Sequence, residues 1–355
     1  MAGYVAKRLA AALATIYLVI TLTFFMVRLM PGSPMSALEA QLQAQGGLTP
    51  AQIAAKVQEV YAVTPTGPLW KQYLQYITSL AHGNLGSSII DPGQTVLSII
   101  AGALPWTLFI IATSLLVSFA IGTVIGTLMA ASPASWFAKV VTGVVSFLSA
   151  VPNYIVALAF IYILADQDHL FPASGAYSLT TTPGLNTPFL LSVLGHGVLP
   201  IACNVVVAFG GWALTMKGSV STIRGGDHLL AGEARGLSRR RLTQSYIGRN
   251  AMLPMVTNLA MSLGYMFGGS VFVETFFVYP GIGYYMIVAV DDRDYSLMMG
   301  CFLLITVAVV LANLIVDFVY PLVDPRIISP AMSGRAFRAV RGRTPGDVGT
   351  AGSAL

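Results

Sequence analysis

Charge is scarce in this sequence. Only 9% of its 355 residues are Asp, Glu, Lys or Arg, whereas 55% are apolar, and the mean hydropathy is +0.75. A soluble domain has about 25% charged and about 45–50% apolar residues. A surface built from this composition would not stay monomeric in water. The composition therefore excludes an ordinary soluble domain and predicts an integral membrane protein.

Cysteine, histidine and lysine are also scarce, and their spacing matches no catalytic or metal-binding pattern. Both cysteines, Cys203 and Cys301, lie in apolar runs, where a thiol more often packs than reacts. The histidines include no pair four residues apart, the spacing of two metal ligands on one helix face. None of the lysines lies in the G-x-x-x-x-G-K-[ST] pattern of a phosphate-binding loop. We therefore expect no ATP hydrolysis by this chain and no cofactor or metal on it.

Long apolar runs dominate the sequence. A helix needs about 20 mostly apolar residues to cross about 30 Å of hydrocarbon, where its backbone groups must be satisfied internally. Six runs have this length: about 9–29, 104–130, 140–165, 190–216, 255–277 and 297–319. We predict an all-α integral membrane protein with six transmembrane helices. Pro152, Pro200 and Pro254 lie in or beside these runs and are expected to bend or end their helices.

The first run has an alternative interpretation as a cleaved signal peptide, because Lys7 and Arg8 precede it. However, the run is longer than the usual length of about 7–15 residues, and Arg28-Leu-Met-Pro-Gly is a poor small-residue cleavage site. We predict an uncleaved membrane anchor.

The distribution of basic residues predicts the orientation of the chain. With the N-terminus inside and alternating spans, 15 of the 19 Lys and Arg residues fall on the cytoplasmic side, while eight acidic residues fall outside. Both termini are then cytoplasmic.

Two segments are too long to be simple connections. Residues 30–103 contain Thr49, Pro50 and Gln52 in the order of a capping box with proline in the first turn, and LWKQYLQYITSL predicts a second short helix. We predict a small extracytoplasmic cap here. The second segment follows about Ser333 and mixes Gly, Arg, Pro and Ala without periodicity, so a disordered C-terminal tail is predicted. The expected organisation is 1–29 for the N-terminus and first helix, 30–103 for the cap, 104–324 for the core with a cytoplasmic loop at 217–253, and 325–355 for the tail.

That cytoplasmic loop contains the charged stretch LLAGEARGLSRRR, residues 229–241. Asp227 is a suitable N-cap and Gly236 a suitable left-handed residue after a helix, so about two helical turns are expected between them. A short, exposed, capped helix can dock into a groove on another protein. It can also rest on the lipid surface, with the three consecutive arginines 239–241 at anionic headgroups. The residues alone leave both interpretations open.

The same loop resembles a known signature. DHLLAGEARGLSRRRL, followed by GRNAMLP, resembles the EAA loop of binding-protein-dependent ABC transporter permeases, in particular the first-subunit type of the dipeptide and oligopeptide branch. His228, Gly232 and Glu233 depart from the family's usual Tyr, Ala and Arg. Further segments resemble the same family in the same order: LTPAQI, YLQYITSLAHGNLGSSI, GALPWTLFI, FLSAVPNYIVAL, GGSVFVETFFVYPGIGYYMIVAV and DFVYPLVDPRI.

The resemblance implies the type I ABC importer permease fold and a multi-pass subunit of the bacterial cell membrane that imports short peptides by alternating access. It implies a second homologous permease subunit, two ATP-binding subunits that carry ATP and magnesium, an extracytoplasmic substrate-binding protein, and no nucleic acid. The loop helix would contact an ATPase subunit. The implied contact residues are Leu230, Ala231, Glu233, Ala234, Arg235, Gly236 and Leu237. Nickel complexes and glutathione stay open as cargo, because similar members of the family carry them.

Polar residues within the apolar runs are candidates for lining a translocation path. The candidates are Asn153, Asn258, Ser262, Tyr265 and Glu274, with Asn204 as a weaker one. Small residues in a membrane helix usually serve close helix packing, so packing is the alternative for the 258–270 region. For Glu274 the alternative is an ion pair, or a hydrogen bond to the backbone, that fixes the VYPGIG turn. Asp317 is expected to form an interfacial ion pair.

Two alternative classes of membrane protein would each require features that the sequence can be checked for. An ion-coupled secondary transporter would have broken helices in inverted repeats and buried carboxylates near the middle of the membrane. The acids of these runs lie toward their ends, which counts against this class. An intramembrane enzyme needs a nucleophile with a base or a metal constellation within the spans, and the sequence suggests neither.

Overall fold

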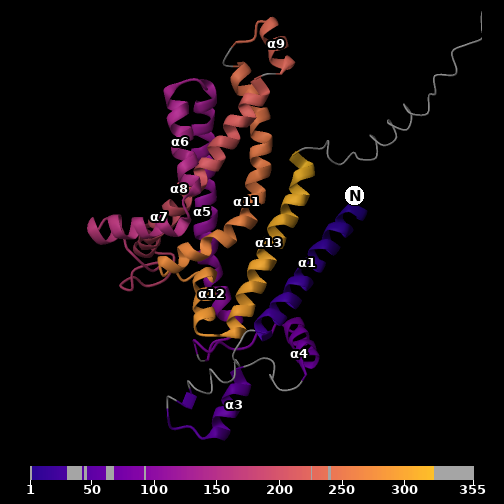
Figure 1. The fold of residues 1–355 in the computed structure, drawn as a ribbon, viewed down its shortest axis with the longest axis vertical. Helices are drawn as coiled ribbons and strands as arrows, with labels where there is room; N and C mark the ends of the chain where they lie inside the picture. The colour runs from indigo at the N-terminus through magenta and orange to yellow at the C-terminus, as the bar shows by residue number, and fades with distance from the viewer. Residues whose placement is uncertain are drawn as a thin grey trace, which may run out of the picture.

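The computed structural model describes residues 2–29, 42–43, 46–60, 68–91, 93–224, 226–238 and 241–323, so the predicted tail lies outside the described residues. The described chain is helical, and its long helices run side by side in a bundle (Figure 1). The long helices are α1 Ala2–Leu29, α5 Val96–Ala131, α6 Trp136–Ala150, α8 Thr187–Arg224, α11 Arg249–Phe276 and α13 Tyr295–Val323. The shorter ones are α3 Pro50–Val60, α4 Leu69–Ala81, α7 Asn153–Phe160, α9 Asp227–Ala234, α12 Ile282–Asp291, and the π-helical η1 Ile161–Gln167 and η2 Leu242–Gly248.

Four described helices are long and apolar enough to cross a membrane, and a fifth span exists if the bent pair α6–α7 counts as one. The four are α1, α5, α8 and α13, and each coincides with a predicted run, although α5 begins at Val96 rather than near 104. Helix α11 coincides with the run at 255–277 and has 28 residues, but Asn258, Ser262 and its glycines make it less apolar. The all-α prediction is confirmed, whereas the count of six spans stays a prediction.

The third predicted run is broken rather than straight. Helix α6 ends at Ala150, α7 begins at Asn153 and continues into η1, and the axis of this second segment differs from that of α6 by 97°. Pro152 lies in the break, and Val151 before it is extended, as sterics require of a residue that precedes proline. The prediction for Pro152 is confirmed, whereas α8 and α11 continue through the other two prolines. The break directs α7 away from the bundle axis (Figure 1).

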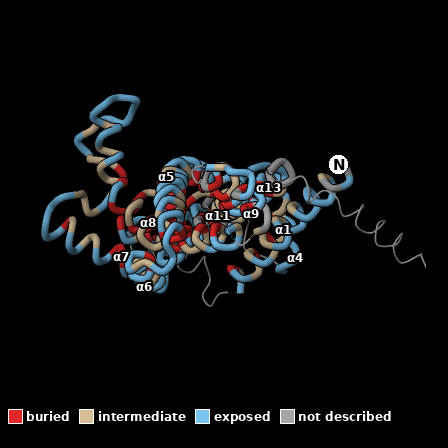
Figure 2. Tube along the Cα trace, turned by 90° about the horizontal axis from the view of Figure 1, so that it is seen from above, coloured by how far each residue is buried: buried red, intermediate tan, exposed pale blue. Residues whose placement is uncertain are grey.

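Helices α5 and α8 approach each other through two glycines. A Cβ on Gly122 would lie within 3 Å of the Trp212 Cβ, and one on Gly126 would meet the Ala213 carbonyl and, at 2.7 Å, the Met216 Cβ. The spacing of four puts both glycines on one helix face, the G-x-x-x-G arrangement that lets membrane helices pack closely. Seen along the bundle, buried residues gather between α5, α8 and α11 (Figure 2).

The two ends of the bundle carry different elements. Helices α3 and α4 lie at one end, and α9 lies at the other, with the start of α1 and the end of α13 (Figure 1). The predicted capping box of α3 is confirmed, because Gln52 Oε1 accepts from Thr49 N at 2.9 Å and Thr49 Oγ1 accepts from Gln52 N at 3.4 Å. The predicted second helix is α4, whose Tyr73 and Tyr76 pack on Phe24 of α1. This contact fastens α4 to the end of the bundle.

A buried aspartate joins the segment before α5 to the start of α13. The Asp294 side chain is fully buried, and its Oδ2 accepts from Ser88 Oγ at 2.6 Å and from Ile89 N at 2.7 Å. Its Oδ1 accepts from Leu297 N at 3.0 Å, so it also caps α13. Asp294 is one of the eight acidic residues predicted to lie on the outer side, but its buried contacts were not predicted from the sequence.

Replacing Asp294 with alanine is expected to destabilise the chain by about 3 kcal/mol, because three buried donors lose their acceptor. Thermal unfolding in detergent measures the loss, and faster hydrogen exchange at residues 86–95 locates it. Asp292→Ala removes an exposed carboxylate of the same loop and should change stability by less than about 0.5 kcal/mol. Equal effects of the two substitutions would show that Asp294 does not hold this segment.

Candidate functional site

The loop between α8 and α11 contains the predicted short helix. Helix α9 covers Asp227–Ala234, and Gly236 follows with a φ of +73°. The Leu237 N–H donates to the Gly232 carbonyl at 3.2 Å. This bond across a left-handed glycine is the Schellman C-cap, so the predicted conformation of Gly236 is confirmed. The side chain of Asp227, the predicted N-cap, lies outside the described residues.

One face of the α9 segment is anchored in the protein. Leu229 is buried in an apolar cluster with Val220 of α8 and Met255 of α11, and Leu237 packs on the same cluster. Gly232 is also buried, and a Cβ there would lie 2.7 Å from the Leu242 side chain. Leu237, predicted as a contact residue for the ATPase, therefore takes part in anchoring the loop.

The other face of the segment is exposed to the surroundings. The exposed residues are Ala231, Ala234, Arg235 and Gly236, which all belong to the predicted contact set. The side chains of Leu230 and Glu233 lie outside the described residues. Three small residues and one arginine thus form an accessible surface on a segment whose opposite face is anchored in the protein.

The chain returns to the bundle through the π-helical segment η2, and π-helical turns often occur at functional sites. Ser238 Oγ accepts from Arg241 N at 3.4 Å at the start of this segment. Asn250 Nδ2 donates to the Tyr246 carbonyl at 2.7 Å where η2 joins α11. Two residues that carry the resemblance, Ser238 and Asn250, therefore shape the return path. Arg239 and Arg240 of the lipid-surface interpretation lie outside the described residues.

Arg224 fastens the beginning of the loop to a third helix. It is the last residue of α8, and its guanidinium donates to the carbonyls of Ala130 and Ala131 at the end of α5. A cation at this place also faces the negative end of the α5 dipole. Arg224 therefore connects the end of α8, from which the loop leads to α9, with the end of α5.

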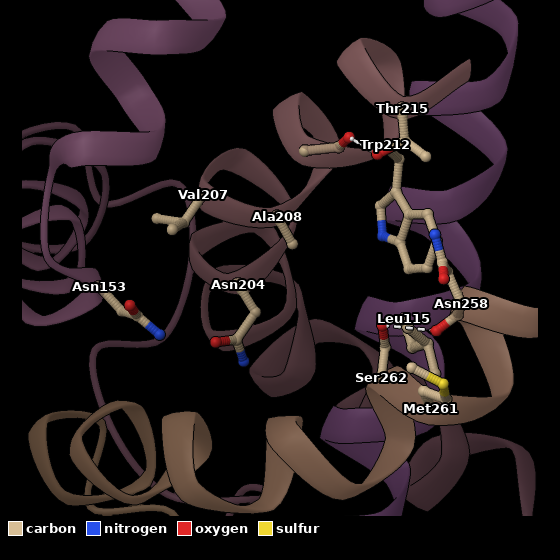
Figure 3. Close-up of a pocket in the computed structure, with 11 residues that line it drawn as sticks. Leu115, Asn153, Asn204, Val207, Ala208, Trp212, Thr215, Asn258, Met261 and Ser262 are labelled. Atoms are coloured by element: carbon tan, nitrogen blue, oxygen red, sulfur yellow. Dashed lines mark hydrogen bonds between the residues drawn. The ribbon is translucent and has the colours of Figure 1, made fainter. Parts of the chain in front are cut away.

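A cavity of about 470 Å³ lies between α5, α7, α8 and α11 (Figure 3). Its volume falls within the range of about 300–1,000 Å³ of small-molecule sites. Asparagines from three helices line it: Asn153 of α7, Asn204 of α8 and Asn258 of α11. The other lining residues are Leu115, Val207, Ala208, Gly211, Trp212, Thr215, Met261 and Ser262. None of the lining residues is charged, so the site can bind through hydrogen bonds and apolar contacts.

The structure thus brings three of the predicted path residues together, namely Asn153, Asn258 and Ser262, and adds the weaker candidate Asn204. Asn153 reaches the cavity because it begins α7 directly after the break at Pro152. The side chain of Tyr265 lies outside the described residues.

Glu274 lies away from this cavity. Its side chain is fully buried, and it accepts from Ser270 Oγ at 2.6 Å and from Gly283 N at 2.7 Å. Beside it, Thr107 Oγ1 accepts from Ile282 N at 2.8 Å. Helices α5 and α11 together hold the turn that leads into α12, in agreement with the alternative stated for Glu274.

Asp317 forms the expected ion pair. Its carboxylate lies 3.0 Å from the Arg8 guanidinium, and the contact joins α13 to α1. Both side chains are partly exposed, so the pair adds only about 0–1 kcal/mol to stability.

Comparison with known proteins identifies the family. The profile of the family described as "Binding-protein-dependent transport system inner membrane component" matches residues 122–329, which include α8, α9 and α11. The chain is 30% identical over 333 residues to the dipeptide transport system permease protein DppB of Lactococcus lactis, across 92% of this chain and 99% of the relative. It is 28% identical to the oligopeptide transport system permease protein OppB of Haemophilus influenzae and 27% identical to DppB of Escherichia coli K12, with the same shares covered. The chain therefore belongs to the family of binding-protein-dependent transport system inner membrane components.

Proposed function

We propose that this chain is the transmembrane permease subunit of an ATP-driven importer of short peptides. The observation that carries the proposal is α9, a short capped helix with one anchored and one exposed face, attached at both ends to helices that line the cavity. Relatives named as dipeptide and oligopeptide permeases, aligned over 92% of the chain, support peptides as the cargo.

The proposed mechanism follows from how α9 connects to the cavity. Thr215 on α8 lies nine residues before Arg224, and Asn258 on α11 lies nine residues after Arg249, which is about 13 Å of helix in each case. An ATPase subunit that moves α9 would shift α8 and α11 together, and with them two walls of the cavity. Alternating opening of these walls toward either membrane face would transfer the peptide, and the chain would supply position and hydrogen bonds without covalent chemistry.

The proposed topology has six spans, α9 and both termini in the cytoplasm, and the α3–α4 cap outside. Two observations support it: α9 lies at the same bundle end as the start of α1 and the end of α13 (Figure 1), and most basic residues fall on that side. The proposed assembly contains a second homologous permease, two ATP-binding subunits that hold ATP and magnesium, and an extracytoplasmic binding protein, in the bacterial cell membrane.

Uptake into proteoliposomes is expected to require the whole assembly. With both permeases, the ATPase subunits and the binding protein present, a labelled dipeptide should accumulate only when ATP is supplied on the α9 side, whereas a proton gradient alone should have no effect. Glutathione and nickel complexes serve as competitors that test the cargo class. Gradient-driven uptake by this chain without any ATPase would contradict the proposal and favour a secondary transporter.

A further inference from the structure

The hydrogen-bonding groups that the cavity offers are mainly amides. The hydroxyls of Ser262 and Thr215 donate at 2.8 Å to carbonyls of their own helices. The other polar groups of the lining are the side-chain amides of Asn153, Asn204 and Asn258 and the indole N–H of Trp212 (Figure 3). An asparagine side chain carries two N–H donors and one carbonyl acceptor, the same kinds of group as in a peptide bond.

Asn204 points to a ligand. Only 5% of this residue is exposed, yet its Nδ2 atom has no hydrogen-bond partner among the described residues. A buried donor without an acceptor is unfavourable and rare in native proteins. Figure 3 shows its amide reaching toward the same part of the cavity as that of Asn153. The thiol of Cys203 donates to the backbone carbonyl of Asn153 at 3.2 Å and so helps to hold the start of α7 in place.

The remaining walls limit what can enter. Leu115, Val207 and Met261 are apolar, and none of the lining residues carries a charge that could form an ion pair. Met261 is 42% exposed, so the cavity is open on one side. A charged group that entered it would lose part of its hydration without gaining an ion pair, whereas a neutral amide would gain hydrogen bonds. The cavity therefore favours neutral amide groups and disfavours charged ones.

We propose that this cavity is a subsite for the peptide group itself, which binds one or two backbone amides of a substrate while the charged termini lie outside it. The inference rests on the proposed function and deepens it. It explains how one permease could carry peptides of different side chains, because every peptide has the same backbone. It also predicts discrimination against free amino acids, which have no peptide group.

Trp212 provides a direct readout, because it lines the cavity. In a full-length chain with Trp70, Trp106 and Trp136 replaced by phenylalanine, it is the remaining tryptophan. In lipid nanodiscs, N-acetylglycine N-methylamide, which has two peptide groups and no charge, should change the Trp212 emission saturably, and glycine should not. Asn204→Leu should weaken this binding about three- to tenfold, the effect of one or two lost hydrogen bonds.

Asn204→Leu should still fold, because it removes a buried donor that has no partner among the described residues. The matched control is Asn313→Leu, at an exposed position of α13 that does not line this cavity, and it should leave the affinity unchanged. The proposal is overturned if the capped probe gives no saturable signal, if glycine binds equally well, or if Asn204→Leu and the parent chain have the same affinity. Quenching of Trp212 by brominated lipid tails would likewise overturn it, because the cavity would then open to the bilayer.

The subsite and the importer can fail separately. ATP-driven peptide uptake by the complete assembly, without any response of Trp212, would reject the subsite and leave the proposed function intact. A saturable response to the capped probe, without ATP-driven uptake, would reject the importer and retain an amide-binding cavity.

Discussion

Exchange of Gly126 for leucine should prevent the helix bundle from assembling. A side chain at this position would overlap sterically with the backbone carbonyl of Ala213 and with the Cβ of Met216, both on α8. Backbone atoms cannot turn aside as a flexible side chain can, so α5 and α8 would have to separate. We expect a loss of more than about 3 kcal/mol, at or above the usual upper end for overpacking. Unfolding of the purified chain in detergent, together with its yield in the membrane, measures the effect.

The matched control for this substitution is Gly102→Leu. Gly102 lies on the same helix, but no heavy atom comes within 4 Å of a Cβ placed there. Leucine also has a higher helix propensity than glycine, so this variant should be as stable as the parent chain. If Gly126→Leu matched the stability of Gly102→Leu, close α5–α8 packing would not be the basis of the bundle.

Gly236→Val should reduce ATP-driven uptake by about tenfold or more, while the chain still reaches the membrane. Gly236 has a φ of +73°, and there is no atom within 4 Å of a Cβ placed there, so the effect would come from backbone conformation rather than crowding. A β-branched residue is strained in the left-handed region by about 1–3 kcal/mol. The C-cap would open, and α9 would no longer transmit a displacement as a fixed body. Uptake of labelled dipeptide per reconstituted transporter is the measurement.

Gly236→Asn separates conformation from residue identity, because asparagine tolerates the left-handed conformation at helix C-termini. This variant should keep most of the uptake. Equal activity of the valine and asparagine variants, whether both high or both low, would show that the left-handed C-cap is not what coupling requires.

Local features of the fold were predictable, because they depend on neighbouring residues. The capping box of Thr49 and Gln52, the left-handed Gly236 and the break at Pro152 each follow from short-range sterics and hydrogen bonding. Three of the path candidates also meet in one cavity, because polar residues in apolar runs tend to face the protein interior.

Long-range features were not predictable in the same way. The contact of Asp294 with Ser88 joins residues 206 positions apart, and that of Arg224 with Ala130 joins residues 94 apart. The size of the bend after α6 depends on what α7 packs against, which no local rule supplies. The pair Gly122 and Gly126 is different, because its G-x-x-x-G spacing is visible in the sequence.

The central claim is that force from an ATP-hydrolysing subunit enters this chain through the exposed face of α9. Cysteines introduced at Ala231 and Ala234, which are both exposed, can be cross-linked in the assembled transporter, and the native Cys203 and Cys301 are buried. Lys71→Cys on α4, at the opposite end of the bundle, is the control. The account predicts cross-links from positions 231 and 234 to an ATP-binding subunit and none from position 71. Failure of both α9 positions to capture that subunit, or their labelling by a membrane-impermeant thiol reagent added outside intact cells, would contradict it.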